Sequence, residues 1–301
     1  MLETTELQEQ NRVRPSELTD DDRRQFSSAG FLILREVLEP TLVEDLRHSF
    51  ERLFAGDFDT GVYPDEWYWR QGISCSDAVR HMTNAWKSSL TMAELALSGR
   101  LARIACQLAG WKGARLGQDS VWWKPPGAGP VAFHQDTSFM DFLDPQQTIT
   151  CWVALDDTLR DGGTLEYATG SHRWPVNKLP NVFGGSEDYR APMLAAAERA
   201  NEPAPQTVQI EVPAGSCVFH SGEIWHGSGR NRRAGLMRRS IGLHYLPDGC
   251  RFSDKPGGYI YRRYQRTNDP ELDESFFPLL WSLDHRRSAW IDTYLMTGRR
   301  Q

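Results

Sequence analysis

The chain has 301 residues, of which 40% are hydrophobic and 25% charged, and its formal net charge is −6. This length allows one large domain with a sizeable core, and the mildly acidic balance argues against nucleic acid or an anionic membrane as a partner. No apolar run approaches the ~20 residues of a membrane helix, and the polar N-terminus lacks the centre of a signal peptide. We therefore expect a cytoplasmic protein with no membrane segment. Its five scattered cysteines, without a C-x-x-C pair, favour reduced thiols over a cysteine zinc site.

The first part of the chain is expected to be largely helical. Residues 1–16 are polar and predict a disordered arm. A helix then begins at Thr19 or Asp20, which can cap it, and ends at Gly30. A strand pattern at 31–34 and helical patterns at 39–54 and 82–110 follow. We expect residues 17–110 to form a helical support for the rest of the chain.

The pattern changes to short strands over residues 111–250, where apolar runs are separated by Gly, Pro, Asp and Asn. These runs are SVWW, TITCWVAL, GTLEYA, TVQIEV, SCVFH and SIGLHYL. Many short strands at regular spacing predict an antiparallel sandwich or barrel. A single domain over residues 17–301, mainly β with supporting helices, fits this order better than two domains.

Two segments do not fit the regular strand pattern. Residues 176–206 form a long insert with a short helix expected at 192–201, and an insert of this length inside a β domain favours a functional lid. The C-terminal segment, residues 251–301, is irregular at first and is expected to be helical from about Glu274.

The stretch VAFHQDTSF contains His134 and Asp136, two residues apart. This spacing alone is more typical of a satisfied polar pair than of a metal site. A metal site needs a third ligand from a distant strand, and the stretch GSCVFHSGEIWHGSG offers His220 and His226. His226 precedes a Gly-Ser-Gly turn that can end a strand, so it is the preferred ligand, with His220 as its rival.

Two imidazoles and one carboxylate on one face of Fe(II) leave open positions that a chelating 2-oxo acid and O2 can fill. The second carboxylate of such a cosubstrate requires a cation, and the planar fork of arginine suits it. Arg238 and Arg239 follow on the next strand. Alternation along that strand puts Arg238 on a small polar face with Ser240, Gly242 and His244. We therefore predict that Arg238 is the cosubstrate arginine.

Several segments occur together and in order: HQD, CWVALDD, DGGTLEYATGSH, HGSGRN and RRSIGLHYLP. With the opening LTDDDRRQFSSAGFLILREVLEP, they resemble the phytanoyl-CoA dioxygenase family of Fe(II)/2-oxoglutarate oxygenases over about residues 17–247. The resemblance implies a double-stranded β-helix, which is a distorted cupin-like jelly roll, with helices on one sheet. It also implies that Fe(II), 2-oxoglutarate and O2 are the cofactor and cosubstrates.

The resemblance further assigns roles to individual residues. It implies iron ligands at His134, Asp136 and His226. It implies 2-oxoglutarate contacts at Arg238, Ser228 and Trp152, with Gln118 as a further candidate for the cosubstrate or substrate pocket. It makes His172, in the Gly-Ser-His turn, a structural residue.

The implied reaction is hydroxylation of an unactivated C–H bond in a small molecule, with formation of succinate and CO2. Asp136 stands where halogenating relatives carry Gly or Ala, which favours oxygen insertion over halogenation. The same chemistry can end in desaturation, epoxidation or ring formation. Two other classes stay open, a 2-oxoglutarate-independent iron oxygenase and a non-catalytic jelly-roll binding protein. Residues 60–86 and 176–206 are expected to shape the substrate mouth, and neither the substrate nor the oligomeric state follows from the sequence.

Overall fold

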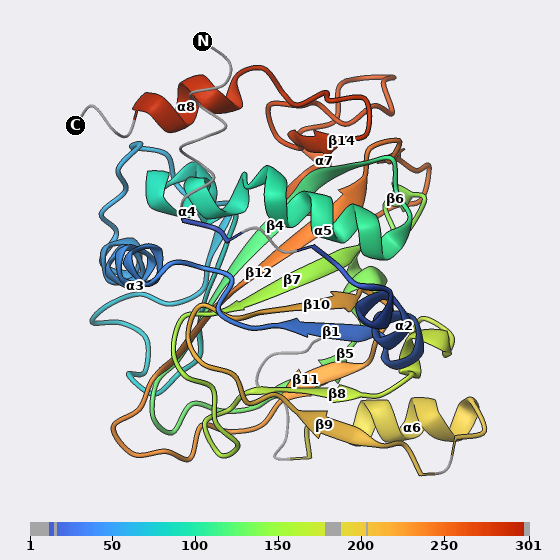
Figure 1. Cartoon of the computed structure of the whole chain (residues 1–301). Coiled ribbons are helices and arrows are strands. Elements are labelled where there is room, and N and C mark those ends of the chain that lie inside the picture. The colour runs from blue at the N-terminus through green and yellow to red at the C-terminus, as the bar shows by residue number, and fades with distance from the viewer. Residues whose placement is uncertain (1–11, 15–16, 178–187, 203, 298–301) are drawn as a thin grey trace.

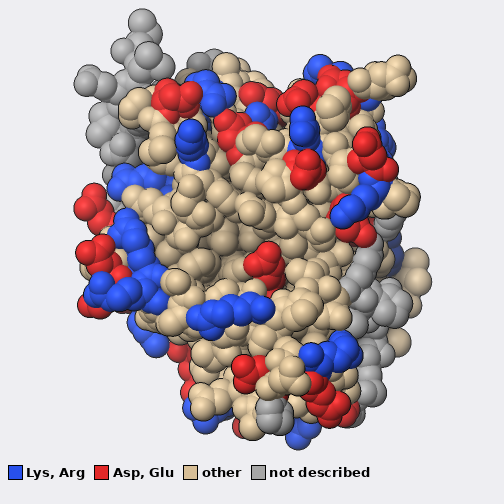
Figure 2. Space-filling model, turned by 90° about the vertical axis from the view of Figure 1, so that its right-hand side faces the viewer, with Lys and Arg blue, Asp and Glu red and all other residues tan. Residues whose placement is uncertain are grey.

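The computed structural model describes residues 12–14, 17–177, 188–202 and 204–297 (Figure 1). Its strands form a large sheet and a smaller one, in the double-stranded β-helix arrangement that the sequence predicts. Figure 2 shows one side of the molecule, where basic and acidic side chains alternate around the margin and the centre is mostly uncharged. No helix in the described part of the chain combines the length and apolarity needed to cross a bilayer.

The large sheet has eight strands. Its order is β1 (Phe31–Leu34), β10 (Cys217–Ser221), β7 (Ile149–Ala154), β12 (Arg238–Pro247), β4 (Gly113–Lys124), β3 (Arg80–Thr83) and β2 (Glu66–Trp67), and β14 (Leu279–Ser282) also pairs with β4. The smaller sheet has the order β5 (Val131–His134), β11 (His226–Ser228), β8 (Leu165–Ala168) and β9 (Thr207–Gln209). A separate pair joins β13 (Arg251–Phe252) to β6 (Leu143–Asp144).

Helices α3 (Pro40–Ala55), α4 (Leu90–Ala96) and α5 (Gly99–Ala109) lie on the outer face of the large sheet (Figure 1). Their apolar faces join the sheet in the main core, where residues such as Leu46 and Phe50 of α3 pack with Val121 and Ile241. Helix α6 (Ala191–Arg199) packs on the smaller sheet through Met193 and Ala196. The remaining helices are α2 (Asp20–Ala29), α7 (Tyr259–Arg262) and α8 (Ile291–Thr297), with short 3-10 turns η1 (Ala85–Lys87), η2 (Asp136–Phe139) and η3 (Ser171–Arg173).

Helix α2 begins and ends where the sequence predicts. The Thr19 hydroxyl accepts from the backbone of Asp22, and the Asp22 carboxylate accepts from the backbone of Thr19, so the two form a capping box. Gly30 ends the helix with φ 86°, and a Cβ there would lie 2.5 Å from Nδ1 of His172. His172 also lies 3.1 Å from the carbonyl of Ser27, which is a structural contact between the end of α2 and η3.

The segment from 82 to 110 is mostly helical, as expected, although it begins as strand because residues 80–83 pair with β4. The expectation of a helix from about Glu274 is wrong. The helix expected from about Glu274 is preceded by β14, since Leu279 and Leu280 are buried and their strand pairs with another part of β4. In both places pairing with a distant strand outweighs the local pattern.

The structure adds detail to three further expectations. The proposed arm at 1–16 lies outside the described residues except at 12–14, where Val13 is buried and bridges to Leu38. Residues 17–110 supply three strands of the large sheet as well as helices. All five cysteines are free thiols, and Cys75 alone is exposed.

Candidate metal centre and active site

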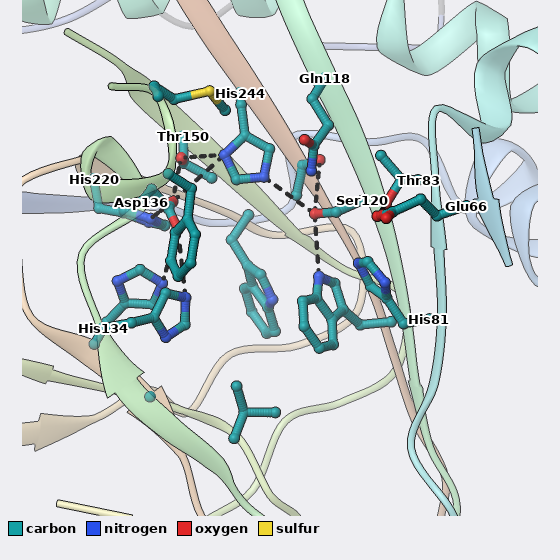
Figure 3. Close-up of a pocket in the computed structure, with 18 of the residues that line it drawn as sticks. Glu66, His81, Thr83, Gln118, Ser120, His134, Asp136, Thr150, His220 and His244 are labelled. Carbon is teal, nitrogen blue, oxygen red and sulfur yellow. Dashed lines mark hydrogen bonds and ion pairs between the residues drawn. The ribbon is translucent and has the colours of Figure 1, made fainter. Parts of the chain in front are cut away.

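A cavity of about 770 Å³ lies between the two sheets. Its walls come from the large sheet, the smaller sheet, η2 and the start of α7. Figure 3 shows that the polar side chains reach into it from opposite walls. His134, His220 and Asp136 gather at one end, and Glu66, Thr83 and His81 lie at the other.

Three potential metal ligands converge at the first of these ends. His134 is the last residue of β5, Asp136 opens η2, and His226 is the first residue of β11. His134 and His226 are register partners in the antiparallel pair, which brings their imidazoles together. The Nε2 atom of each imidazole lies 3.5 Å from Oδ1 of Asp136. The three ligand atoms lie within 4.8 Å of one another.

Backbone carbonyls orient both imidazoles. Nδ1 of His134 lies 2.8 Å from the carbonyl of Ala132, and Nδ1 of His226 lies 3.1 Å from the carbonyl of Ile224. A carbonyl only accepts, so Nδ1 of each ring donates to it, and Nε2 is the ring nitrogen that lies on the side of Asp136. Burial also lowers the pKa of His226 well below its ordinary value, which favours the neutral form that binds metals.

The other oxygen of Asp136 is held by the protein. Thr150 donates to Oδ2 over 2.6 Å, and Nε2 of His220 lies 3.1 Å from the same atom. Nδ1 of His220 lies 2.8 Å from the hydroxyl of Tyr167. His220 therefore contacts the side of Asp136 that faces away from the two oriented imidazoles. Burial opposes ionisation of Asp136, but the surrounding imidazoles and hydrogen bonds keep its pKa well below the ordinary value.

The two adjacent arginines of β12 point in different directions. Arg238 is buried, lines the cavity and donates to the carbonyl of Gly163 and the hydroxyl of Ser240. Arg239 instead binds Asp156 through both its backbone and its guanidinium. Burial lowers the pKa of Arg238 to about 10, and the charge of Asp156 offsets only part of this effect. Among the described residues, no carboxylate forms an ion pair with this buried guanidinium.

The other predicted cosubstrate residues also line the cavity. Trp152 lies under the guanidinium of Arg238, which is 5.9 Å from the ring centroid. Ser228 lies on β11, two residues after His226. Gln118 lies opposite His244 in the β4–β12 pair and also lines the cavity (Figure 3).

A buried lysine was missed at the sequence level. Lys124 is fully buried, and its Nζ donates to the hydroxyl of Ser228 and the carbonyl of Gly229, each over 2.7 Å. Burial and the charge of Arg238 lower the pKa of Lys124 well below the ordinary value. The motif KPPG placed this lysine at the end of a strand, and its pairing opposite Arg238 is visible only in the sheet register.

The cavity mouth differs in part from the expected one. Glu66, His81 and Thr83 come from the 60–86 segment, as expected, but the C-terminal segment contributes Ile260 and Tyr261 of α7. The described residues of the 176–206 insert do not line the cavity. Residues 178–187 of this predicted lid lie outside the described part of the chain.

The donor set fits Fe(II). Two imidazoles and one carboxylate, with open space beside them, match the arrangement found in non-haem iron oxygenases. The jelly-roll fold and this site together define that class of enzyme. A family model described as Phytanoyl-CoA dioxygenase (PhyH) matches residues 26–240, and the chain belongs to this family. It is therefore a dioxygenase that uses iron, 2-oxoglutarate and O2.

Individual relatives agree with the family assignment. The peroxisomal phytanoyl-CoA dioxygenase of Rattus norvegicus is 24% identical over 258 residues, which are 80% of this chain and 72% of the rat protein. The phytanoyl-CoA dioxygenase of Arabidopsis thaliana is 30% identical over 163 residues, which are 52% of this chain and 53% of that protein.

Solved structures share the fold. The non-haem α-ketoglutarate-dependent carbocyclase SnoK from nogalamycin biosynthesis has a TM-score of 0.68 and 23% identity, and the match covers 89% of this chain and 100% of SnoK. The epimerase SnoN, in complex with Fe3+, α-ketoglutarate and nogalamycin RO, has the same score and identity over 87% of this chain and 98% of SnoN.

Proposed function

We propose that this protein hydroxylates an unactivated C–H bond of a small molecule, with His134, Asp136 and His226 as the ligands of Fe(II). The observation that carries this proposal is the convergence of Nε2, Oδ1 and Nε2 of these residues within 4.8 Å in a buried cavity. The carbonyls behind both imidazoles support it, because they leave each Nε2 free to coordinate.

The cosubstrate site in this proposal centres on Arg238. 2-Oxoglutarate carries a second carboxylate far from its chelating end, and a buried guanidinium without an ion pair in the described structure suits it. Ser228 supplies a hydroxyl, and Trp152 supplies an apolar wall beside the same pocket. Lys124 holds Ser228 from behind and adds positive potential.

When bound, iron would supply the oxidant from O2 and 2-oxoglutarate, with one oxygen atom going into succinate as CO2 is lost and the other available to the substrate. The chain positions the ligands, excludes water and orients the substrate. Asp136 provides a carboxylate ligand, so the iron position that a halide takes in halogenating relatives is filled here. This supports oxygen insertion as the outcome. Desaturation, epoxidation or ring formation use the same machinery, and SnoK and SnoN carry names for other outcomes on this fold.

The walls of the cavity support a substrate without phosphate groups. Among the described residues that line it, Arg238 is the only lysine or arginine, and the proposal commits it to 2-oxoglutarate. Phosphate recognition normally uses Arg or Lys clusters. Apolar side chains such as Phe139, Trp122 and Ile260 cover much of the remaining surface. We infer a small, partly apolar substrate rather than a CoA thioester.

A panel of small molecules, with and without a CoA moiety, tests the proposal. Each is incubated with the protein, Fe(II), 2-oxoglutarate and O2, and succinate and product mass are measured. A substrate that stimulates succinate formation and gains one oxygen atom supports hydroxylation. A product that loses two hydrogens indicates desaturation or ring formation instead. If no reaction forms succinate in an Fe(II)-dependent manner, whether a panel compound is present or not, the proposed function is contradicted.

A further inference from the structure

A chain of hydrogen bonds runs along one wall of the cavity and ends on Asp136 (Figure 3). Nε1 of Trp122 donates to the hydroxyl of Ser120 over 3.1 Å, and this hydroxyl lies 3.1 Å from Nε2 of His244. Nδ1 of His244 lies 2.9 Å from the hydroxyl of Thr150, which donates to Oδ2 of Asp136 over 2.6 Å. These hydrogen bonds thus link an indole of the cavity wall to a proposed iron ligand.

The two ends of this chain fix the direction of three of its four bonds. The indole N–H of Trp122 can only donate, and the Asp136 carboxylate can only accept. The single proton of Thr150 goes to Asp136, so Thr150 accepts from Nδ1 of His244. The Ser120 hydroxyl has two neighbours that can accept its proton, Nε2 of His244 and the carbonyl of Gly242 at 3.4 Å. The bonds from His244 through Thr150 therefore point toward Asp136, and Nδ1 of His244 carries a proton.

The sheet register builds this chain. His244 of β12 is the partner of Thr150 on β7, and Gly242 is the partner of Ser120 on β4. A Cβ on Gly242 would lie 2.7 Å from the Ser120 hydroxyl oxygen, so glycine leaves the space that this hydroxyl occupies. Thr150, Ser120 and His244 are all buried. Hydrogen bonds in such a setting are shielded from competing water.

We propose that His244 is a positioning residue that acts on Asp136 through Thr150. Thr150 holds Oδ2, and this leaves Oδ1 directed at Nε2 of His134 and His226, each 3.5 Å away. His244 in turn fixes the rotation of the Thr150 hydroxyl. Trp122 and Ser120 connect this relay to the cavity wall. The inference rests on the proposed function, since it assigns Asp136 to the metal, and it adds a dependence of iron affinity on residues remote from the metal.

A double-mutant cycle on iron affinity tests the relay. Fe(II) is titrated anaerobically into the metal-free full chain, and dissociation constants are measured by calorimetry. Thr150→Val keeps the side-chain shape but removes the donor, and it should weaken Fe(II) binding by about 10-fold or more. His244→Leu should also weaken binding, but it should have no further effect in the Thr150→Val background, because His244 acts only through Thr150.

Conservative variants separate positioning from folding. His244→Asn keeps a donor near the place of Nδ1, and Thr150→Ser keeps the hydroxyl, so both should bind Fe(II) within a few-fold of wild type. Thr148→Val is the matched control, because Thr148 is also buried and donates to the carbonyl of Tyr245 rather than to Asp136. Its Fe(II) affinity should be unchanged, and thermal melts of all variants show whether the fold persists.

The outcomes are distinct. The relay is supported if His244→Leu weakens Fe(II) binding in wild type but not in the Thr150→Val background. It also requires that His244→Asn and Thr150→Ser keep their Fe(II) affinity. Effects that add in the double mutant would overturn it, because Nδ1 of His244 also lies 3.5 Å from Oδ2 of Asp136 and would then act directly or by packing. The relay would also be overturned if Thr148→Val lost as much Fe(II) affinity as Thr150→Val. A wild-type chain that fails to bind Fe(II) would overturn the proposed function and the relay together.

Discussion

Arg238 and Lys124 are register partners on β12 and β4, and both side chains are buried. In the described structure neither forms an ion pair with a carboxylate. Burial and the nearby charge of Arg238 lower the pKa of Lys124 well below its ordinary value. Two adjacent buried cations are costly unless an anion joins them. This pairing is the feature that most strongly suggests an anionic cosubstrate beside the proposed metal site.

Lys124→Met tests the contribution of the second cation. The variant removes a buried charge and the donor to Ser228, so the 2-oxoglutarate concentration needed for half-maximal succinate formation should rise roughly tenfold, or about 1.4 kcal/mol. Lys112→Met is the control, since Lys112 is exposed and does not line the cavity. If Lys124→Met needs no more 2-oxoglutarate than wild type, Lys124 does not contribute to cosubstrate binding and Arg238 is the only cation that does.

The third metal ligand can be identified by two glutamine variants. His226→Gln should abolish tight Fe(II) binding, because it removes a ligating Nε2. His220→Gln should largely retain it, because the amide can still donate to Oδ2 of Asp136 in place of Nε2. Equilibrium dialysis with Fe(II) under anaerobic conditions measures both. Loss of iron only in His220→Gln would make His220 the ligand.

The local motifs of the site could be predicted from the sequence, whereas its cross-strand relationships could not. His134 and Asp136 lie two residues apart in the chain, and side-chain alternation within one strand separates Arg238 from Arg239. Lys124 and Thr150 acquire meaning only through the partners that the sheet places beside them. A lysine in a strand pattern is ordinarily solvated, so nothing in the sequence marks Lys124 as buried.

Elements of the fold with local sequence signals could likewise be predicted, whereas those that depend on distant strands could not. The early helix at 20–29 has local start and stop signals, and the structure agrees with them. Strands β3 and β14 lack such signals, because they form against β4, which is remote in sequence. The participation of α7 in the cavity also depends on tertiary packing, in which Tyr261 stacks on Phe142.

His81 should make the free energy of unfolding decrease in acid. Burial lowers its pKa to about 3, below the ordinary 6.5, so the folded state holds the ring neutral. Stability from this group is fully present above pH ~6.5 and is lost as the pH falls toward 3, at about 1.4 kcal/mol per pH unit. Urea unfolding measures the free energy of unfolding at pH 6.5 and at pH 5.5. This free energy should fall less between the two pH values in His81→Phe than in wild type. Equal decreases would contradict a lowered pKa of His81 in the folded state.

The two sides of the cavity mouth are joined by a buried carboxylate. Asp65, next to Glu66 of β2, forms ion pairs with Lys87 over 2.9 Å and with Arg263, next to α7, over 2.7 Å. Tyr264 also donates to it. Asp65→Ala leaves the largely buried Lys87 without this partner, so it should lower the free energy of unfolding by about 3 kcal/mol.

A matched surface variant controls for the loss of an ion pair. Asp21 pairs with Arg24 on the exposed face of α2, so Asp21→Ala should change the free energy of unfolding very little. Urea denaturation measures both variants, and limited proteolysis should show faster cleavage near α7 in Asp65→Ala alone. Similar small effects in the two variants would mean that Asp65 does not hold the mouth together.

We propose that one cavity holds Fe(II) on His134, Asp136 and His226 and 2-oxoglutarate on Arg238. An anaerobic titration of the Fe(II)-loaded chain with 2-oxoglutarate, followed by visible absorption, measures both sites at once. Wild type and Arg239→Ala are predicted to develop a weak charge-transfer band at similar 2-oxoglutarate concentrations, and Arg238→Ala to require far more. No band in wild type, or a greater requirement in Arg239→Ala than in Arg238→Ala, would contradict the claim.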